Sequence, residues 1–276
     1  MRKSLLFIMT SLALVFASCK DENEDDDEQK KPNDEKVDEG NKENQKEPVS
    51  VNDDDIYLKF SIVSSGEVEL TGFKESFKGS PVVKENFKSI SIPDEVIIGG
   101  VAHKVVTIGE QAFDGCTSLT SIEIPNSVNE IGRAFSGCTS LTSIEIPNSV
   151  TSIGELAFWD CTNLTSIVIP NSVTEIGDRA FAYCTSLASV EIPNSVTEIG
   201  NNAFGSCTSL TSIVVDKGNK VYDSRENCNA IIKTASKTLI RGCHNTVIPN
   251  SVTVIGECAF SGCTSLTSIE IPNSVT

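Results

Sequence analysis

The chain has 276 residues, with 38 acidic and 22 basic side chains and a net charge of −16. Nucleic acid is excluded as a partner, because phosphate binding needs clustered Lys and Arg and the sequence has no basic stripe. The acidic excess is concentrated near the N-terminus, where residues 20–55 hold 16 Asp and Glu against six Lys.

The first 18 residues have the parts of a signal peptide. Arg2 and Lys3 precede an apolar run, residues 5–16, that is too short to span a bilayer comfortably. The run ends in Phe16-Ala17-Ser18-Cys19, which resembles a bacterial lipobox, although lipoboxes prefer Leu where this chain has Phe16. We therefore expect residues 1–18 to be a lipoprotein signal peptide and Cys19 to be the lipid attachment site. Secretion by a different peptidase, with Cys19 incidental, is the alternative.

Residues 19–55 are predicted to form a disordered acidic tether. They contain no aromatic side chain and no periodic apolar pattern, so they cannot bury enough surface to order themselves. The acidic run that follows Cys19 resembles the export signal that sends lipoproteins of some Gram-negative anaerobes to the outside of the outer membrane. A charge run is also the ordinary signature of a solvated segment. We expect a surface-exposed outer-membrane lipoprotein that contacts the membrane through its lipid anchor only.

Residues 56–106 are predicted to be an N-terminal β cap. Apolar residues alternate with polar ones, a Ser-Ser-Gly turn follows at 64–66, and the alternation then returns. The apolar positions are Ile56, Leu58, Phe60, Ile62, Val68 and Leu70. A hairpin here would cover the open apolar end of the first repeat.

Internal repetition dominates residues 107–276. An Ala-Phe-x-x-Cys element recurs at Cys116, Cys138, Cys161, Cys184 and Cys207, in steps of 22, 23, 23 and 23 residues, and resumes at Cys263. The short step reflects one residue missing from 131–135. Between Cys207 and Cys263 the pattern diverges, at about 214–248.

Each unit has a physical interpretation. Ile122 and Ile124 alternate with Glu123, as in a half-buried strand, and a Pro-Asn-Ser turn at 125–127 leads to a second short inward-facing stretch. One unit cannot bury its own apolar face, so units must stack at about 4.8 Å. We predict a right-handed solenoid of ~23-residue coils, with a parallel sheet through the Ile-Glu-Ile segments and short turns or helical pieces elsewhere. The residues Phe135, Phe158, Phe181 and Phe204 should then line up.

The repeat motif resembles the BspA-like (treponemal-type) leucine-rich repeat family of surface proteins. It reads Cys-x-x-Leu-x-x-Ile-x-Ile-Pro-x-x-Val-x-x-Ile-Gly-x-x-Ala-Phe-x-x-Cys and covers about residues 107–276. The segment 227–243 also resembles a divergent repeat of that family. The resemblance implies an adhesin-like role that recognises host or cell-surface macromolecules.

The cysteines and histidines do not indicate chemistry. The repeated Cys positions are interpreted as small buried residues copied by duplication, and disulfides between neighbours are the alternative. No Cys-x-x-Cys pair is present, and His103 and His244 lie far apart, so we expect no zinc and no other cofactor. No nucleophile–base pair or phosphate loop is recognisable, and we expect no enzymatic activity.

Binding is expected on the outward positions of the Ile-Glu-Ile segments. The candidate residues are Ser121, Glu123, Ser143, Glu145, Ser166, Ser189, Glu191 and Ser212. Outward strand positions must be polar in any case, but a long polar face also offers many weak contacts to an extended partner. The expected partners are extracellular or cell-surface proteins. A glycan-capture lipoprotein and a purely structural spacer are the alternatives.

Overall fold

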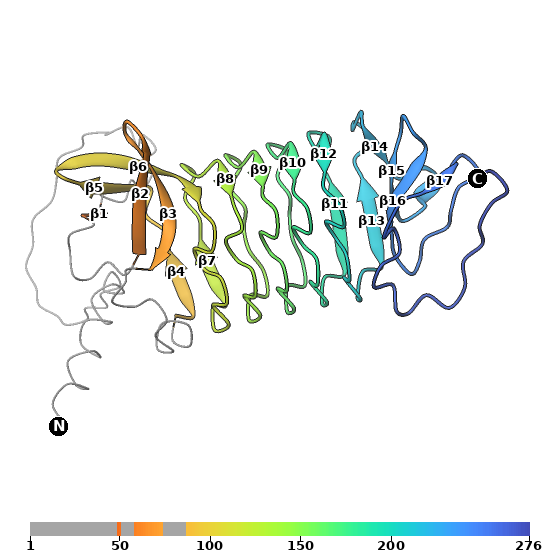
Figure 1. The fold of residues 1–276 in the computed structure, drawn as a ribbon, viewed down its shortest axis with the longest axis horizontal. Coiled ribbons are helices and arrows are strands. Elements are labelled where there is room, and N and C mark those ends of the chain that lie inside the picture. The colour runs from red at the N-terminus through yellow and green to blue at the C-terminus, as the bar shows by residue number, and fades with distance from the viewer. Residues whose placement is uncertain (1–48, 51–57, 74–86) are drawn as a thin grey trace, which may run out of the picture. The chain divides into compact units, whose positions relative to one another are not determined.

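The computed structural model describes residues 49–50, 58–73 and 87–276, which belong to a compact unit spanning Lys46–Thr276 (Figure 1). A second unit, Met1–Gln45, lies outside the described residues, as do the expected signal peptide, Cys19 and most of the expected tether. Within that tether, β1 (Val49–Ser50) pairs in parallel with β5 (Glu95–Ile98). In the described part of the chain, no helix is long and apolar enough to cross a membrane.

A β hairpin stands at the N-terminal side of the repeats. Strands β2 (Leu58–Ser64) and β3 (Glu67–Phe73) pair antiparallel around Gly66, whose φ of 85° suits a tight turn. The inner strand is β3, because Val68 and Leu70 are fully buried whereas Ile62 on β2 is 58% exposed. Strand β3 pairs in parallel with β6 (Val101–Ile108), which joins the hairpin to the first coil.

Repeat-type pairing is already present N-terminal to residue 107. Strand β4 (Ser89–Ser91) pairs in parallel and in register with β7 (Ser121–Glu123), so Ser89–Ser91 already occupies the place of a coil strand. Strands β5 and β6 form a second antiparallel hairpin, which turns through Gly99 and Gly100 at positive φ.

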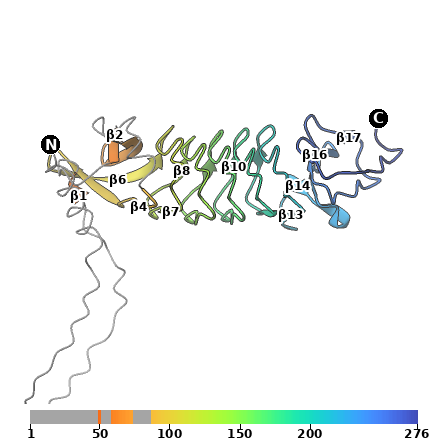
Figure 2. The same ribbon diagram turned by 90° about the horizontal axis from the view of Figure 1, so that it is seen from below.

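The coils stack in a row, which both ribbon views show for the residues from β6 to β13 (Figure 1 and Figure 2). The strands of this region are β8 (Glu130–Ile131), β9 (Ser152–Ile153), β10 (Glu175–Ile176), β11 (Ser189–Ile192), β12 (Glu198–Ile199) and β13 (Ser212–Val215). The continuous parallel ladder runs β6-β8-β9-β10-β12, through the second short stretch of each unit. The Ile-Glu-Ile segments pair less continuously than predicted, as β4–β7, β11–β13 and a single bridge from Glu145 to Val168.

One glycine per coil follows the ladder strand, and these glycines, which we call the glycine column, explain where the backbones of neighbouring coils lie closest together. A Cβ atom on Gly177 would lie 2.5 Å from the backbone nitrogen of Glu155, and one on Gly200 would lie 2.4 Å from that of Asp178. Only glycine permits such an approach of two backbones. Each Gly N–H also donates to the preceding coil, as from Gly177 to Ile153 at 2.7 Å. The tightest coil contact therefore adjoins the short strands.

The phenylalanines form one continuous buried column, as predicted. The rings of Phe113, Phe135, Phe158, Phe181 and Phe204 lie parallel to within 9°, with neighbouring centroids 5.2–5.3 Å apart. All five are essentially inaccessible to solvent. Stacking thus gives each coil the core that it cannot build alone.

The Ala-Phe segments are turns, one of the two forms predicted for them, and not helical pieces in the described coils. The Phe N–H donates to the next coil, as from Phe135 to the carbonyl of Ala157 at 2.8 Å, whereas Ala157 donates within its own segment, to the carbonyl of Gly154 at 3.3 Å. Left-handed residues also flank Phe158 on both sides, at Leu156 (φ 56°) and Asp160 (φ 58°), and such residues interrupt an α-helix.

The divergent segment interrupts the stack with its own small sheet. Its elements are β14 (Tyr222–Asp223), the 3-10 helix η1 (Arg225–Asn227), β15 (Ala230–Lys233), β16 (Thr238–Gly242) and β17 (Val254–Ile255). Strands β15 and β16 form an antiparallel hairpin, and β17 then resumes parallel pairing. Asn219 bridges to the preceding coil, since its side-chain NH₂ donates to the carbonyls of Pro193 and Val196 at 2.8 and 2.9 Å.

Candidate binding face

The predicted outward residues lie in two neighbouring columns, which we call the strand face. The serine column contains Ser121, Ser143, Ser166, Ser189 and Ser212, and the acidic column contains Glu123, Glu145, Val168, Glu191 and Val214. Parallel strand pairing places Ser189 beside Ser212, Glu191 beside Val214, and Glu145 beside Val168. All ten side chains are exposed except that of Ser212, which is half-buried.

The serine hydroxyls of the strand face differ from the threonine hydroxyls beside them. Thr165 donates to the carbonyl of Thr142, and Thr211 donates to that of Ala188, each one coil earlier. Thr120 likewise donates to Lys88. These threonines therefore hold coils together. The serines of the column make no side-chain hydrogen bond within the described part of the chain, so their hydroxyls remain available to a partner.

The acidic column combines carboxylates with exposed valines. Glu123 accepts a hydrogen bond from Ser91 at 2.5 Å, whereas Glu145 and Glu191 are held by no ion pair in the described part. Val168 is 77% exposed and Val214 is 45% exposed. The column contains no cation, so the strand face favours positively charged partners that also carry apolar groups.

A hollow of about 540 Å³ adjoins the C-terminal end of the strand face. Glu191 and Val214 form one side of it, and Tyr222, Asp223 and Arg225 of the divergent segment form another. Arg225 donates to Asp223 from Nε at 2.7 Å and from a terminal nitrogen. Burial alone would raise the pKa of Asp223, but hydrogen bonds from Arg225 and from Thr234 lower it below its usual value.

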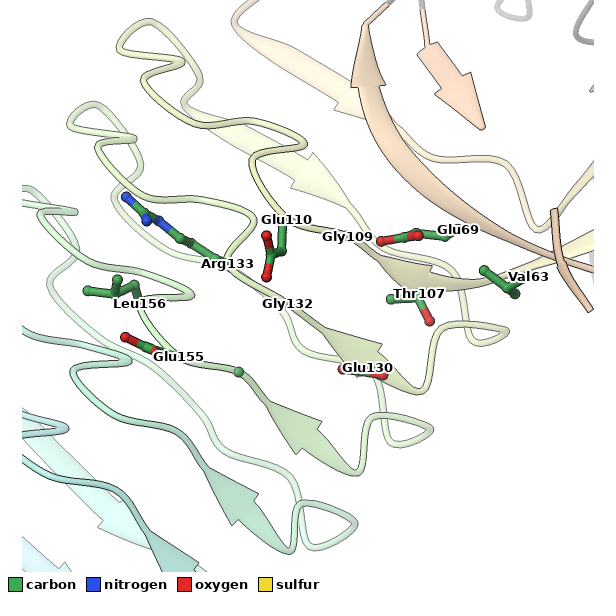
Figure 3. A pocket seen from close by; sticks show the side chains of 11 residues that line it. Val63, Glu69, Thr107, Gly109, Glu110, Glu130, Gly132, Arg133, Glu155 and Leu156 are labelled. Atoms are coloured by element: carbon green, nitrogen blue, oxygen red, sulfur yellow. The ribbon is translucent and has the colours of Figure 1, made fainter. Parts of the chain in front are cut away.

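A second hollow, of about 700 Å³, lies over the shortened second coil (Figure 3). That coil has only Arg133 where its neighbours have two residues, Glu110-Gln111 and Glu155-Leu156. Its backbone turns more tightly, with the N–H of Ala134 bonded to the carbonyl of Gly132 at 2.8 Å. Sequence reasoning missed this hollow, although the 22-residue step between two cysteines was its signal.

The charge of this second hollow is mainly negative. Four carboxylates line it, those of Glu69, Glu110, Glu130 and Glu155, together with the guanidinium of Arg133 (Figure 3). These residues lie on the hairpin and on three successive coils. This excess of carboxylates over the guanidinium would favour a cationic group in the hollow over an anionic one.

The cysteine column is structural. No disulfide joins the cysteines of the described part, and the thiol of each inner member of the column donates to a main-chain carbonyl one coil earlier, as Cys161 does to Phe135 at 3.2 Å. Burial raises the pKa of Cys161 to about 12 and that of Cys207 to about 12. Among the described residues, no group of three or more His, Cys, Asp or Glu side chains is placed to hold a metal ion.

Comparison with known proteins identifies the repeats. Residues 106–231 and 240–276 match the BspA-type leucine-rich repeat region, in six copies. No curated protein matches the chain.

Several solved structures share the fold. A leucine-rich repeat protein from Bacteroides ovatus is 31% identical, with a TM-score of 0.60, over 80% of this chain and 53% of its own. A leucine-rich cell surface protein from Faecalibacterium prausnitzii is 26% identical, with a TM-score of 0.54, over 83% of this chain and 72% of its own. The leucine-rich repeat protein of Treponema pallidum is 28% identical, with a TM-score of 0.54, over 78% of this chain and 96% of its own. The chain thus spans about half the length of the B. ovatus protein. It belongs to the BspA-type leucine-rich repeat family.

Proposed function

We propose that the protein is a non-catalytic, cell-surface binding protein that recognises extracellular or cell-surface proteins through the strand face, in the manner of an adhesin. One observation supports this most: five neighbouring coils present a serine hydroxyl in one outward column, and three of them present a carboxylate in the other. A repeated face offers many weak contacts, and such contacts add when one extended partner reaches several coils.

The proposal extends to location. The lipobox-like sequence that ends in Cys19 and the acidic residues after it support a lipoprotein on the outside of the outer membrane of a Gram-negative bacterium. One of the similar structures carries the description of a cell surface protein, which favours the same location for this chain. Protease shaving of intact cells tests the location, because an outward-facing module is cut without lysis.

Binding of proteins fits the strand face better than capture of glycans. Sugar rings stack on aromatic side chains, and the two outward columns hold Ser, Glu and Val instead. The aromatic pair of half-buried Trp159 and exposed Tyr183, with ring centroids 5.6 Å apart, lies in the Phe-x-x-Cys turns and outside both columns.

Two charge-matched variants test the face. Glu145→Lys with Glu191→Lys changes the strand face, and Glu175→Lys with Glu198→Lys makes the same change on exposed residues of the β10–β12 ladder. Each protein is assayed against immobilised extracellular matrix proteins and polysaccharides. We expect the first variant to lose binding and the second to keep it. Equal binding by both, or loss only in the second, would overturn the assignment to the strand face. Failure of the wild-type chain to bind any of them would favour a structural spacer.

A further inference from the structure

Two large aromatic side chains break the repeat in neighbouring coils. Trp159 fills the first position between Phe and Cys in one coil, and Tyr183 fills the second position in the next. In the other regular coils these two positions hold Asp114-Gly115, Ser136-Gly137, Gly205-Ser206 and Ser261-Gly262. The rings of Trp159 and Tyr183 meet edge to face, with centroids 5.6 Å apart and planes inclined at 64°. The two departures from the repeat therefore form one contact, which we call the aromatic pair.

The backbone at Tyr183 indicates that the fold itself does not require an aromatic residue there. Tyr183 has a φ of 63°, and the same turn position is Gly, at φ 65–75°, in three of the other coils. Positive φ is unfavourable for a bulky residue and costs Gly nothing. The N–H of Tyr183 donates to the carbonyl of Gly205 at 2.8 Å, and the N–H of Gly137 makes the equivalent bond to Trp159 at 2.7 Å. Stacking thus needs no side chain at this position, and an unfavourable backbone conformation that packing does not demand is typical of functional sites.

The exposed apolar surface around the aromatic pair is small. Within the described part of the chain, Tyr183 is the one exposed large apolar residue of the Phe-x-x-Cys turns, and Trp159 beside it is half-buried. The turns on either side contribute only Ser136-Gly137 and Gly205-Ser206. A stable protein–protein interface buries about 800 Å² on each partner, which is far more than two partly exposed rings supply. The aromatic pair is therefore better suited to a narrow ligand of ring size.

The turns that carry the aromatic pair offer a hydrogen-bond acceptor and no net charge. Asp160 holds the position of Tyr183 one coil earlier, and its N–H donates to the carbonyl of Ala182 at 2.9 Å. The carboxylate of Asp160 forms no ion pair in the described part of the chain. Residues 156–161 and 179–184 contain one acid, Asp160, and one base, Arg179, in a protein of net charge −16. This local balance favours a neutral ligand whose hydroxyl groups can donate to a carboxylate.

A sugar ring has this combination of properties. A pyranose with equatorial hydroxyls exposes a face of C–H groups that stacks on an aromatic ring, and the hydroxyls around its edge need hydrogen-bond partners. Asp160 directly follows Trp159 and shares the turn position of Tyr183, so its carboxylate neighbours both rings. We propose that Trp159, Tyr183 and Asp160 form a second binding site, outside the strand face, for a neutral glycan of β-linked glucose or N-acetylglucosamine.

The tryptophan of the aromatic pair supplies the readout. Trp159 is the single Trp of the chain, so the tryptophan fluorescence of the purified protein reports on this site alone. Cellohexaose and N-acetylchitohexaose are the probes, and tetramethylammonium chloride is the control for a cation bound on the ring faces. We expect a saturable change in emission with at least one hexasaccharide and none with the ammonium ion. Absence of a saturable change with both sugars, or a change with the ammonium ion alone, would overturn the proposal.

Protein variants locate the site. Tyr183→Gly introduces the residue of the other coils, and Asp160→Asn keeps a side chain that tolerates positive φ, so both should fold, which urea denaturation checks. Each should bind the hexasaccharide about tenfold more weakly than the wild type. Val214→Ser, on the strand face, removes a side chain that is 45% exposed, as Tyr183 is 46% exposed, and should leave sugar binding unchanged. Wild-type affinity in both turn variants would overturn the proposal.

One further variant separates this site from the strand face. Glu145→Lys with Glu191→Lys alters only the strand face, so it should bind the hexasaccharide as tightly as the wild type does. Loss of sugar binding in this variant would place the sugar on the strand face and overturn the assignment to the aromatic pair.

Discussion

The thiol of Cys184 donates a hydrogen bond to the main-chain carbonyl of Phe158 in the preceding coil, at 3.2 Å. The same contact recurs at Cys138, Cys161 and Cys207. A small buried residue was expected at this position, and the hydrogen bond explains what Cys provides beyond its size. The alternative of disulfides between neighbours is not realised in the described part of the chain.

Thiol reactivity should follow this environment. At pH 8 the buried thiol of Cys161, whose pKa burial raises to about 12, has almost no thiolate, whereas Cys258 is exposed. Because the thiolate is the nucleophile, we expect iodoacetamide to modify Cys258 about 100-fold faster than Cys161 or more. Mass spectrometry of time-quenched samples measures both rates. Denatured protein is the control, and the two rates should converge there. Rapid alkylation of Cys161 in the folded chain would contradict a buried column.

The glycine column offers a matched pair of substitutions. In Gly177→Ala the new Cβ would meet backbone atoms at 2.5–2.6 Å, whereas in Gly132→Ala the nearest atom is 3.2 Å away. Overpacking of this kind costs about 1–3 kcal/mol, so Gly177→Ala should lower the free energy of unfolding by that amount. Gly132→Ala should lower the free energy of unfolding by less than about 1 kcal/mol, because the neighbouring atoms need to move only slightly. Urea denaturation of both variants shows which substitution lowers the free energy of unfolding more. A larger loss for Gly132→Ala would be inconsistent with the observed stacking.

Asp223 should make the stability of the divergent segment depend on pH. Burial would raise its pKa, but the hydrogen bonds from Arg225 and Thr234 prevail, so the pKa is lower in the folded than in the unfolded chain. The stabilisation is therefore present above the unfolded pKa, near pH 4, and is lost as pH falls through the folded value. Asp223→Asn should lower the free energy of unfolding most near pH 7 and progressively less towards pH 2. Urea denaturation of the wild type and the variant across this pH range measures the difference between their free energies of unfolding. That difference must become smaller as the pH falls.

Local periodicity was enough to predict the core. The period-2 alternation of Ile122 and Ile124, the 23-residue recurrence of Phe and the hairpin turn at Gly66 all appear where the sequence placed them. These features depend on which side chains must leave water, and that information is contained in each unit.

Features that depend on contacts between coils were not predictable. The continuous ladder follows the close backbone approach at Gly177, which no single unit reveals. The left-handed backbone at Asp160 and Tyr183 is imposed by hydrogen bonds to the next coil, although Gly occupies the same turn position elsewhere. The hydroxyl of Thr165 ties two coils together, a role that no single unit reveals.

The outward columns exist only if neighbouring coils are in register, and a disulfide test measures this most directly. Ser189 and Ser212 are paired in the parallel sheet, where Cα atoms lie about 4.8 Å apart, within the range that a disulfide spans. Mild oxidation of the Ser189→Cys and Ser212→Cys double variant should join these two positions, as seen by mass spectrometry of peptides. The Ser189→Cys and Val214→Cys variant, shifted by two residues to a Cα separation of about 8 Å, should stay reduced. Crosslinking of the shifted pair in preference to the paired one would contradict the register and, with it, the strand face.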